Sequence, residues 1–162
     1  MSAWRMPARP TGVSGSSLKL RAMSLDDLPF VMQVEKLAYE FPWTEGIFRD
    51  CLRVGYCCRV LEDRGRLIGH GVMLVSTNEC HLLNVCIHPS YQRRGLGRKL
   101  LLYLLEVARK GHATVALLEV RRSNKAAYAL YNELGFNEIG VRKNYYPARR
   151  GREDAFVLAR DL

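Results

Sequence analysis

Hydrophobic and polar residues from Leu18 to Leu162 follow patterns that divide this part of the chain into a regular series of strands and helices. Alternation of apolar and polar positions predicts a strand, and apolar positions three or four residues apart predict an amphipathic helix. The resulting order is β-α-α-β-β-β-α-β-α-β-β. Such an order indicates an α/β domain with a mixed central sheet flanked by helices.

The predicted elements have recognisable boundaries. The strands are LKLRAM, YCCRVLED, RLIGHGVMLVSTN, ECHLLNVCIHP, TVALLEVR, FNEIGVRKNYY and EDAFVLARDL, of which the second to fourth are expected to form an antiparallel meander. The helices are SLDDLPFVMQVEKLAYE, EGIFRDCLR, GLGRKLLLYLLEVARKG and NKAAYALYNELG. Ser24 and Thr44 are the expected N-caps of the first two helices, and Gly111 and Gly135 are expected to end the last two.

The composition is that of one globular domain preceded by a different kind of segment. The chain has 162 residues, 48% of them hydrophobic and 25% charged, which is enough to bury a core without disulfides. Residues 1–17 are rich in Pro, Gly, Ser and Arg without periodicity, so we predict a disordered basic leader there and a single domain over 18–162. The leader lacks the apolar core of a secretory signal.

The cysteines and histidines do not show the spacing of a metal site. There are five cysteines without a CxxC pair and four histidines without an HxxxH pair. Cys51, Cys57, Cys58, Cys80 and Cys86 are therefore interpreted as thiols of a protein in the reducing cytoplasm, and no metal is expected.

The net charge of +9 and the pI near 9.6 favour a polyanionic ligand or partner. A phosphate-bearing cofactor, RNA and a membrane surface would each fit, and so would a solvated basic surface without any specific partner. Charge alone does not choose among them.

The turn QRRGLG, residues 92–97, lies between a predicted strand and a predicted helix. A helix N-terminus carries unpaired N–H groups and a partial positive charge, so it can hold phosphate. Gly95 and Gly97 would let a diphosphate approach the backbone closely. The neighbouring cations are Arg93, Arg94 and Arg98. The motif is neither a Walker A loop nor a dinucleotide-binding GxGxxG.

With this turn the chain resembles the GNAT acetyltransferases, whose Q/R-x-x-G-x-G/A motif wraps the pyrophosphate of acetyl-coenzyme A. The resemblance covers almost all of residues 18–162. Within that family, AYEFPW, NVCIHPSYQRRGLGR, LEVRRSNKAAYALYNELGF, RKNYYP and GREDAFVLA are similar to the bacterial RimI group, which acetylates the N-terminal alanine of small-subunit ribosomal protein eighteen. The resemblance implies the GNAT fold, with a parallel, splayed pair formed by the fourth and fifth strands, and acetyl-CoA as cosubstrate.

The resemblance also implies where the cofactor would bind. Its pantetheine arm is peptide-like and would pair with the main chain of the fourth strand. The family usually carries a small residue such as alanine in place of Cys86, which main-chain contacts tolerate. Asn124 is expected to cap the following helix and, by the resemblance, to contact the same arm. The implied cofactor-binding residues are Val85, Cys86, Ile87, Arg93, Arg94, Gly95, Leu96, Gly97, Arg98 and Asn124.

Two side chains are candidates for proton transfer. Glu119 is a lone carboxylate in an apolar strand, so a general base and a structural salt bridge to an arginine are both open from the residues alone. Tyr128 and Tyr131 share a helix face, and each could protonate a thiolate or simply pack in the core. The resemblance implies Glu119 as the base, acting through a water, and Tyr131 as the acid.

Three loop aromatics, Trp43, Tyr145 and Tyr146, are candidates for acceptor binding. Loop residues often serve binding, although aromatics can equally close the ends of a sheet. By the resemblance, FPW and NYYP flank the acceptor groove.

The predicted function is direct transfer of an acetyl group from acetyl-CoA to the N-terminal alanine of a ribosomal protein, in the cytoplasm, with transient ribosome association and no specific nucleic acid or membrane as partner. An enzyme that acetylates protein lysines or a small amine is the alternative, although the loops EFPWTEG and RKNYYPARRGRED are poor in unpaired acids that would bind a small cation. A remote alternative is an inactive ribosome- or RNA-binding module, which would not need Glu119, Tyr131 and the glycine turn together.

Overall fold

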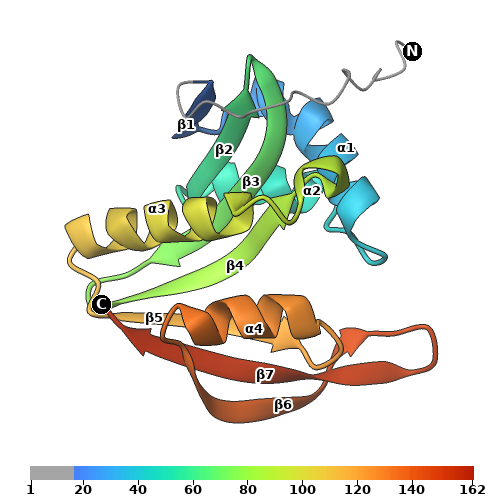
Figure 1. Cartoon of the computed structure of the whole chain (residues 1–162), viewed down its shortest axis with the longest axis vertical. Coiled ribbons are helices and arrows are strands. Elements are labelled where there is room, and N and C mark those ends of the chain that lie inside the picture. The colour runs from blue at the N-terminus through green and yellow to red at the C-terminus, as the bar shows by residue number, and fades with distance from the viewer. Residues whose placement is uncertain (1–16) are drawn as a thin grey trace.

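The computed structural model describes residues 17–162, which form one seven-stranded sheet with helices on both faces (Figure 1). The strands are β1 (Leu18–Ala22), β2 (Cys57–Asp63), β3 (Arg66–Val75), β4 (Glu79–Ile87), β5 (Val115–Arg121), β6 (Asn137–Pro147) and β7 (Arg152–Asp161). The helices are α1 (Leu28–Ala38), α2 (Glu45–Arg53), α3 (Leu96–Lys110) and α4 (Lys125–Glu133), with short 3₁₀ turns η1 (Leu25–Asp27) and η2 (Pro89–Tyr91). Apart from these turns, the order is the one predicted. The predicted leader, residues 1–17, lies outside the described residues except for Ser17.

Helix starts follow the local capping chemistry, with one difference from the prediction. Thr44 caps α2, because its side-chain oxygen accepts a hydrogen bond from the Ile47 amide at 3.3 Å. Ser24, by contrast, begins η1, and α1 follows only at Leu28. The carboxylate of Asp27 accepts a hydrogen bond from the Ser24 amide at 2.8 Å, which stabilises this first turn.

The two predicted glycine ends behave differently. Gly135 follows α4 with φ of +87°, the left-handed conformation that closes a helix without steric cost. Gly111 is the C-cap of α3 with φ of −81°, and the left-handed residue is His112, with φ of +69°.

The sheet has the strand order β1-β2-β3-β4-β5-β7-β6, and β4–β5 is its parallel pair. This pairing ends at Leu82 opposite Leu118, after which the two strands diverge (Figure 1). A bulge adds to the divergence, because Asn84 pairs with Val72 and Leu82 with Met73, leaving Leu83 without a partner on β3. The splayed parallel pair is therefore confirmed.

Two hydrophobic clusters lie on opposite faces of the sheet. One cluster packs α1 and α2 against β2, β3 and β4. The other packs α3 against the opposite face, including residues of β5 and β7. The second cluster is tight enough that a Cβ on Gly71 would lie 2.7 Å from Leu104. In contrast, α4 has no fully buried residue, so its side chains stay partly exposed to solvent. Within residues 17–162, no helix is long and apolar enough to cross a membrane.

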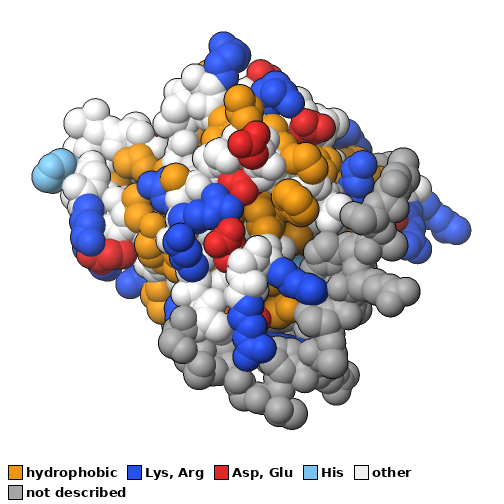
Figure 2. All heavy atoms as spheres, turned by 90° about the horizontal axis from the view of Figure 1, so that it is seen from above, with side chains coloured by type: hydrophobic (Ala, Val, Ile, Leu, Met, Phe, Trp, Pro, Cys, Tyr) orange, Lys and Arg blue, Asp and Glu red, His pale blue; other side chains and the backbone are white. Residues whose placement is uncertain are grey.

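Much of the positive charge has local acidic partners. Figure 2 shows Asp and Glu side chains interspersed among Lys and Arg on the face that it displays. Arg21, for example, contacts both Asp27 and Glu62, at 2.7 and 2.8 Å. Arginines paired with carboxylates within residues 17–162 include Arg49, Arg53, Arg98, Arg109, Arg121, Arg122, Arg142 and Arg149. Part of the net positive charge, which the sequence alone did not explain, is therefore used in ion pairs within the domain.

Candidate active site

A cavity of about 320 Å³ opens where β4 and β5 diverge. From α1 and the segment after it, the lining residues are Glu35, Tyr39, Phe41 and Trp43. From the strands, α4 and its N-cap, they include Leu82, Val85, Leu118, Glu119, Val120, Asn124, Ala127, Tyr131 and Tyr146. Because α1 and α4 pack on opposite faces of the sheet, the cavity passes between the two strands and connects both faces.

Glu119 lies on β5, one residue beyond the last pair between β4 and β5, with its side chain 8% exposed. Its Oε2 is 2.5 Å from Nε2 of His81 on β4. Its Oε1 is 3.3 Å from Nε of Arg142 on β6. The carboxylate is therefore paired with an arginine, which agrees with a structural salt bridge. It also lines the cavity, which agrees with a role as general base.

The pKa of Glu119 lies below its ordinary value. Burial acts to raise this pKa, but the hydrogen bond from His81, together with the charge of Arg142, outweighs burial. The group is thus an ionised carboxylate at neutral pH and accepts hydrogen bonds only. Of the two ways in which a buried carboxylate can be tolerated, the protein uses pairing and not a raised pKa.

The two candidate tyrosines of α4 have different surroundings. Tyr131 lines the cavity, and burial raises its pKa to about 12, so its phenol is protonated at neutral pH. Its ring packs edge-on against Phe136. Tyr128 instead donates a hydrogen bond to Glu138 at 3.0 Å and packs against Phe156. Only Tyr131 of these two is placed to reach a group bound in the cavity.

Beyond Leu82, the edge of β4 that no longer pairs with β5 borders the cavity. The side chains of this part of β4 alternate between the two hydrophobic clusters. The carbonyl oxygen of Val85 accepts a hydrogen bond from the Tyr39 hydroxyl at 2.7 Å. Val85 and Ile87 face the α3 core, whereas Cys86 faces the α1–α2 core. Cys86 is a core residue, and burial raises the pKa of its thiol well above the ordinary value, so the thiol is protonated at neutral pH.

The glycine turn has the backbone geometry expected of an anion site. Gly95 is the N-cap of α3 with φ of +76°, and Arg93 also has a positive φ, of 62°. The first helical amide with a backbone acceptor is that of Lys99, bonded to the Gly95 carbonyl at 3.1 Å, so the amides before it point outward from the helix start. A Cβ on Gly97 would lie 3.8 Å from Leu130, which leaves room for a methyl group but not for a large side chain.

The remaining residues of the predicted cofactor set are distributed around this turn. Leu96 is buried in the α3 core. Arg94 lies over the ring of Tyr91, 5.3 Å from its centroid. Arg98 contacts Glu133 of α4 at 2.5 Å, so this cation already has a partner. Asn124 caps α4, since its side chain accepts a hydrogen bond from the Ala127 amide at 3.2 Å, and it also lines the cavity.

The three predicted acceptor aromatics separate into two groups. Trp43 and Tyr146 line the cavity, whereas Tyr145 packs against Tyr146 with ring centroids 4.9 Å apart. Arg121, which sequence reasoning missed, lies over the Tyr146 ring at 4.5 Å and donates to the Pro147 carbonyl at 2.7 Å. It thereby fixes the β6–β7 hairpin against β5.

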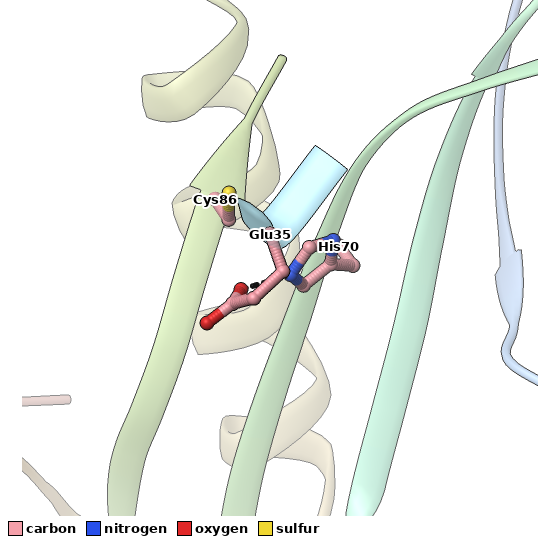
Figure 3. A group of neighbouring side chains, drawn as sticks. All are labelled: Glu35, His70 and Cys86. Carbon is pink, nitrogen blue, oxygen red and sulfur yellow. Dashed lines mark hydrogen bonds and ion pairs between the residues drawn. The ribbon is translucent and has the colours of Figure 1, made fainter. Parts of the chain in front are cut away.

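Sequence reasoning also missed Glu35, a cavity-lining residue of α1 whose side chain lies beside His70 of β3 and Cys86 of β4 (Figure 3). Its carboxyl group accepts hydrogen bonds from the Trp43 amide at 3.0 Å, from His70 at 2.8 Å and from the Asn84 side chain at 3.2 Å. Ligand-type atoms of Glu35, His70 and Cys86 lie within 4.8 Å of one another. A glutamate at a buried position of an amphipathic helix was the available signal, but its side-chain partners, His70 and Asn84, are 35 and 49 residues away.

Comparison with known proteins agrees with this geometry. Residues 21–136 match the model of the acetyltransferase (GNAT) family. Ribosomal protein bS18-alanine N-acetyltransferase of Escherichia coli (strain K12) is 40% identical over 140 residues, which are 86% of this chain and 95% of that relative. The crystal structure of the ribosomal-protein-S18-alanine N-acetyltransferase from Escherichia coli gives a TM-score of 0.84 at 39% identity, covering 90% of this chain and 94% of that one.

A more distant structure shares the fold alone. It is a Salmonella typhimurium protein solved with its cofactor acetyl-CoA, with a TM-score of 0.72 at 19% identity, covering 90% of this chain and 94% of that one. The family match spans well over half of the sequence, and the divergence of β4 from β5 and the glycine turn before α3 are in their expected places. The chain belongs to the GNAT family of acetyltransferases.

Proposed function

We propose that this enzyme transfers an acetyl group from acetyl-CoA directly to the α-amino group of an N-terminal alanine, with ribosomal protein bS18 as acceptor, as the names of its relatives state for them. The observation that carries the proposal is the cavity through the sheet, which has Glu119 and Tyr131 in its walls. A cosubstrate and an acceptor can then enter from opposite faces and meet between β4 and β5.

Acetyl-CoA would supply the activated acyl group, and the residues present fit it. The outward amides at the start of α3 and the left-handed Gly95 suit a diphosphate. The unpaired edge of β4 beyond Leu82 suits a peptide-like arm, and the half-exposed α4 leaves space beside it. The ribosomal acceptor rests on the names of the relatives, and the proposed cytoplasmic location follows from that acceptor.

Glu119 would take a proton from the acceptor amine, directly or through a water, and Tyr131 would protonate the departing thiolate. A terminal α-amino group titrates near pH ~8, roughly two units below lysine, so a carboxylate with a low pKa suffices to help it. The phenol of Tyr131 is protonated at neutral pH, which suits the role of acid.

The acceptor would lie between Trp43 and Tyr146 at the α1 side of the cavity. Glu40 and Glu153 line a neighbouring hollow that also borders Tyr39, Phe41 and Asn124, and both have partners within the chain, since Glu40 contacts Arg149 and Glu153 contacts Arg121 at 2.8 Å. A free polyamine would therefore find few unpaired carboxylates, which favours a peptide over a small cation.

A panel of three acceptors tests the proposal. It consists of an alanine-starting peptide without lysine, the same peptide with a blocked N-terminus and one added lysine, and a free polyamine. After incubation with acetyl-CoA, mass spectrometry should find one acetyl group on the α-amine of the first peptide and much slower modification of the others. Preferential lysine or polyamine acetylation would replace this proposal with the corresponding alternative, and salt-sensitive RNA binding without turnover would replace both.

A paired substitution tests the cofactor site. Gly97→Trp should weaken coenzyme A binding by about tenfold or more, because the indole would fill the space before α3, whereas Gly97→Ala should bind like the wild type. Calorimetric titration with coenzyme A measures both. Equal affinities in the two variants would remove the glycine turn from the site.

A further inference from the structure

We propose that His81 is a positioning residue for Glu119 that also makes acetyl transfer sensitive to pH, an inference that rests on the proposed role of Glu119 as base. His81 lies on β4, two residues before the bulge at Leu83, and crosses to β5 at the point where the strands begin to diverge. Its Nε2 is 2.5 Å from Oε2 of Glu119, so it touches the candidate base without itself lining the cavity.

The direction of this hydrogen bond follows from the state of the carboxylate. An ionised carboxylate can only accept hydrogen bonds, so Nε2 of His81 carries the proton and donates it to Glu119. The donor holds one oxygen, Arg142 lies near the other at 3.3 Å, and the carboxylate is thus fixed in rotation about its Cγ–Cδ bond. A fixed carboxylate keeps its remaining lone pairs aimed at one place, which is what proton abstraction from a bound amine requires.

The second ring nitrogen gives the pair its pH sensitivity. The side chain of His81 is 30% exposed, so its second ring nitrogen, Nδ1, is open to water while Nε2 is bonded to Glu119. Imidazole is the side chain that exchanges protons with water between pH 5 and 8. An imidazolium beside Glu119 attracts the carboxylate charge more strongly than neutral imidazole does, which lowers the basicity of Glu119.

The charged groups on the same face of the sheet define this environment. By strand alternation and register they are Glu79 on β4, Glu119 and Arg121 on β5, Arg142 on β6, and Glu153 and Asp161 on β7. The Glu35–His70 pair of α1 and β3 lies on the same face. Glu119 is the group among them in direct contact with His81.

The proton count shows why the state of this pair matters. A protonated acceptor amine brings three N–H protons, and the amide product keeps one. One proton ends on the sulfur of coenzyme A as the C–S bond breaks and the C–N bond forms, and one must leave to the solvent. Glu119 receives this last proton as an N–H bond breaks and an O–H bond forms, and it passes the proton to water before the next cycle.

Substitutions at position 81 separate the donor from the charge. His81→Gln retains an N–H donor but cannot titrate, and His81→Ala removes both. We expect His81→Ala to lower kcat about tenfold or more with KM for acetyl-CoA unchanged, and His81→Gln to recover most of that loss at pH 8. In the wild type, the decline of kcat/KM as pH falls should follow two protonations, one of the acceptor amine and one of His81. In His81→Gln, the same decline of kcat/KM should follow one protonation only, that of the amine.

Two further variants serve as controls. His112→Asn replaces an exposed histidine at a left-handed position that asparagine tolerates, and it should keep the wild-type rate and profile. Arg142→Gln removes the other partner of Glu119 but leaves His81, so it should keep the two-proton limb. Thermal unfolding and coenzyme A titration show that each variant is folded and binds.

The assay follows thiol release with whichever amine the wild type acetylates, so the inference is judged apart from the identity of the acceptor. A wild type that prefers lysine would overturn the proposed acceptor and leave the His81 comparison decisive. An unchanged rate in His81→Ala, a two-proton limb in His81→Gln, or no thiol release with any amine would each overturn the role proposed for His81.

Discussion

Two carboxyl–histidine pairs lie on either side of the bulge in β4, and they have different surroundings. In the Glu35–His70 pair the side chains are 1% and 0% exposed, and in the Glu119–His81 pair they are 8% and 30% exposed. Glu35 also accepts hydrogen bonds from the Trp43 amide and from Asn84, so donors from three elements converge on it. Glu119 has one hydrogen-bond donor and one arginine, and it borders the cavity.

From this comparison we expect the number of donors and the access to solvent to separate a structural carboxyl group from the proposed base. The same two residue types form both pairs. Glu35 is surrounded by N–H donors, which would repel a cation, so we read its proximity to His70 and Cys86 as a hydrogen-bonded cluster and not as a metal site. Glu119 retains lone pairs facing a space that a substrate can enter.

The largest expected effect is that of Glu119→Gln on turnover. The amide keeps the shape of the side chain but cannot take a proton, so kcat should fall about 10³-fold while coenzyme A affinity stays within about twofold. Steady-state kinetics with the alanine-starting peptide and calorimetry with coenzyme A measure the two quantities. A wild-type kcat in the variant would show that Glu119 belongs with Glu35 as a structural group.

Glu35→Gln should have the opposite signature. The amide nitrogen would face N–H donors that the carboxyl group now satisfies, so the free energy of unfolding should fall by about 3 kcal/mol, while kcat per folded molecule changes by less than about threefold. Urea unfolding measures this loss. Glu45→Gln, which disrupts an exposed pair with Arg49, is the matched control and should cost less than about 0.5 kcal/mol.

Elemental analysis of the purified wild type sharpens the same point. We expect less than about 0.1 equivalent of zinc, because binding there would require Glu35 to give up hydrogen bonds to N–H donors. A stoichiometric metal lost in Glu35→Gln would show that the buried cluster is a metal site.

The sequence predicted well whatever depends on neighbours three or four residues apart. The cap at Thr44, the left-handed Gly135 and the alternation that places Glu119 within a strand are all local signals, and each is where the sequence put it. The start of α1 was predicted three residues too early, because the Asp27 carboxylate and the Ser24 amide form a separate turn first.

The two carboxyl–histidine pairs depend on how distant elements pack and pair, which a single sequence does not encode directly. His81 and Glu119 are 38 residues apart, and they meet only because β4 and β5 pair in parallel as far as Leu82 and Leu118. Glu35 and His70 come from a helix and a strand 35 residues apart. Likewise, Tyr128 and Tyr131 could not be separated by pattern, since the choice depends on which one lines a cavity formed by distant elements.

Tyr131→Phe is expected to lower kcat by about 10²-fold, because thiolate departure would then lack its proton donor. Tyr128→Phe is the matched control on the same helix, and it should lose only a surface hydrogen bond to Glu138. Since burial raises the pKa of Tyr131 to about 12, the wild type should show no loss of kcat from this phenol below about pH 10. Equal rates in the two tyrosine variants would exclude Tyr131 as the acid.

The smallest effect concerns acid stability. The pKa of Glu119 is lower in the folded protein than its ordinary value, so the ion pairs with His81 and Arg142 stabilise the fold above the unfolded pKa of about 4.3 and lose this contribution as pH falls through the folded pKa. The difference in unfolding free energy between the wild type and Glu119→Gln should therefore shrink, by an amount on the order of 1 kcal/mol, as pH is lowered from 6 towards 3. Urea unfolding across this range measures it. A difference that stays constant would mean that the folded carboxylate is no better paired than the unfolded one, and that His81 and Arg142 do not hold its charge.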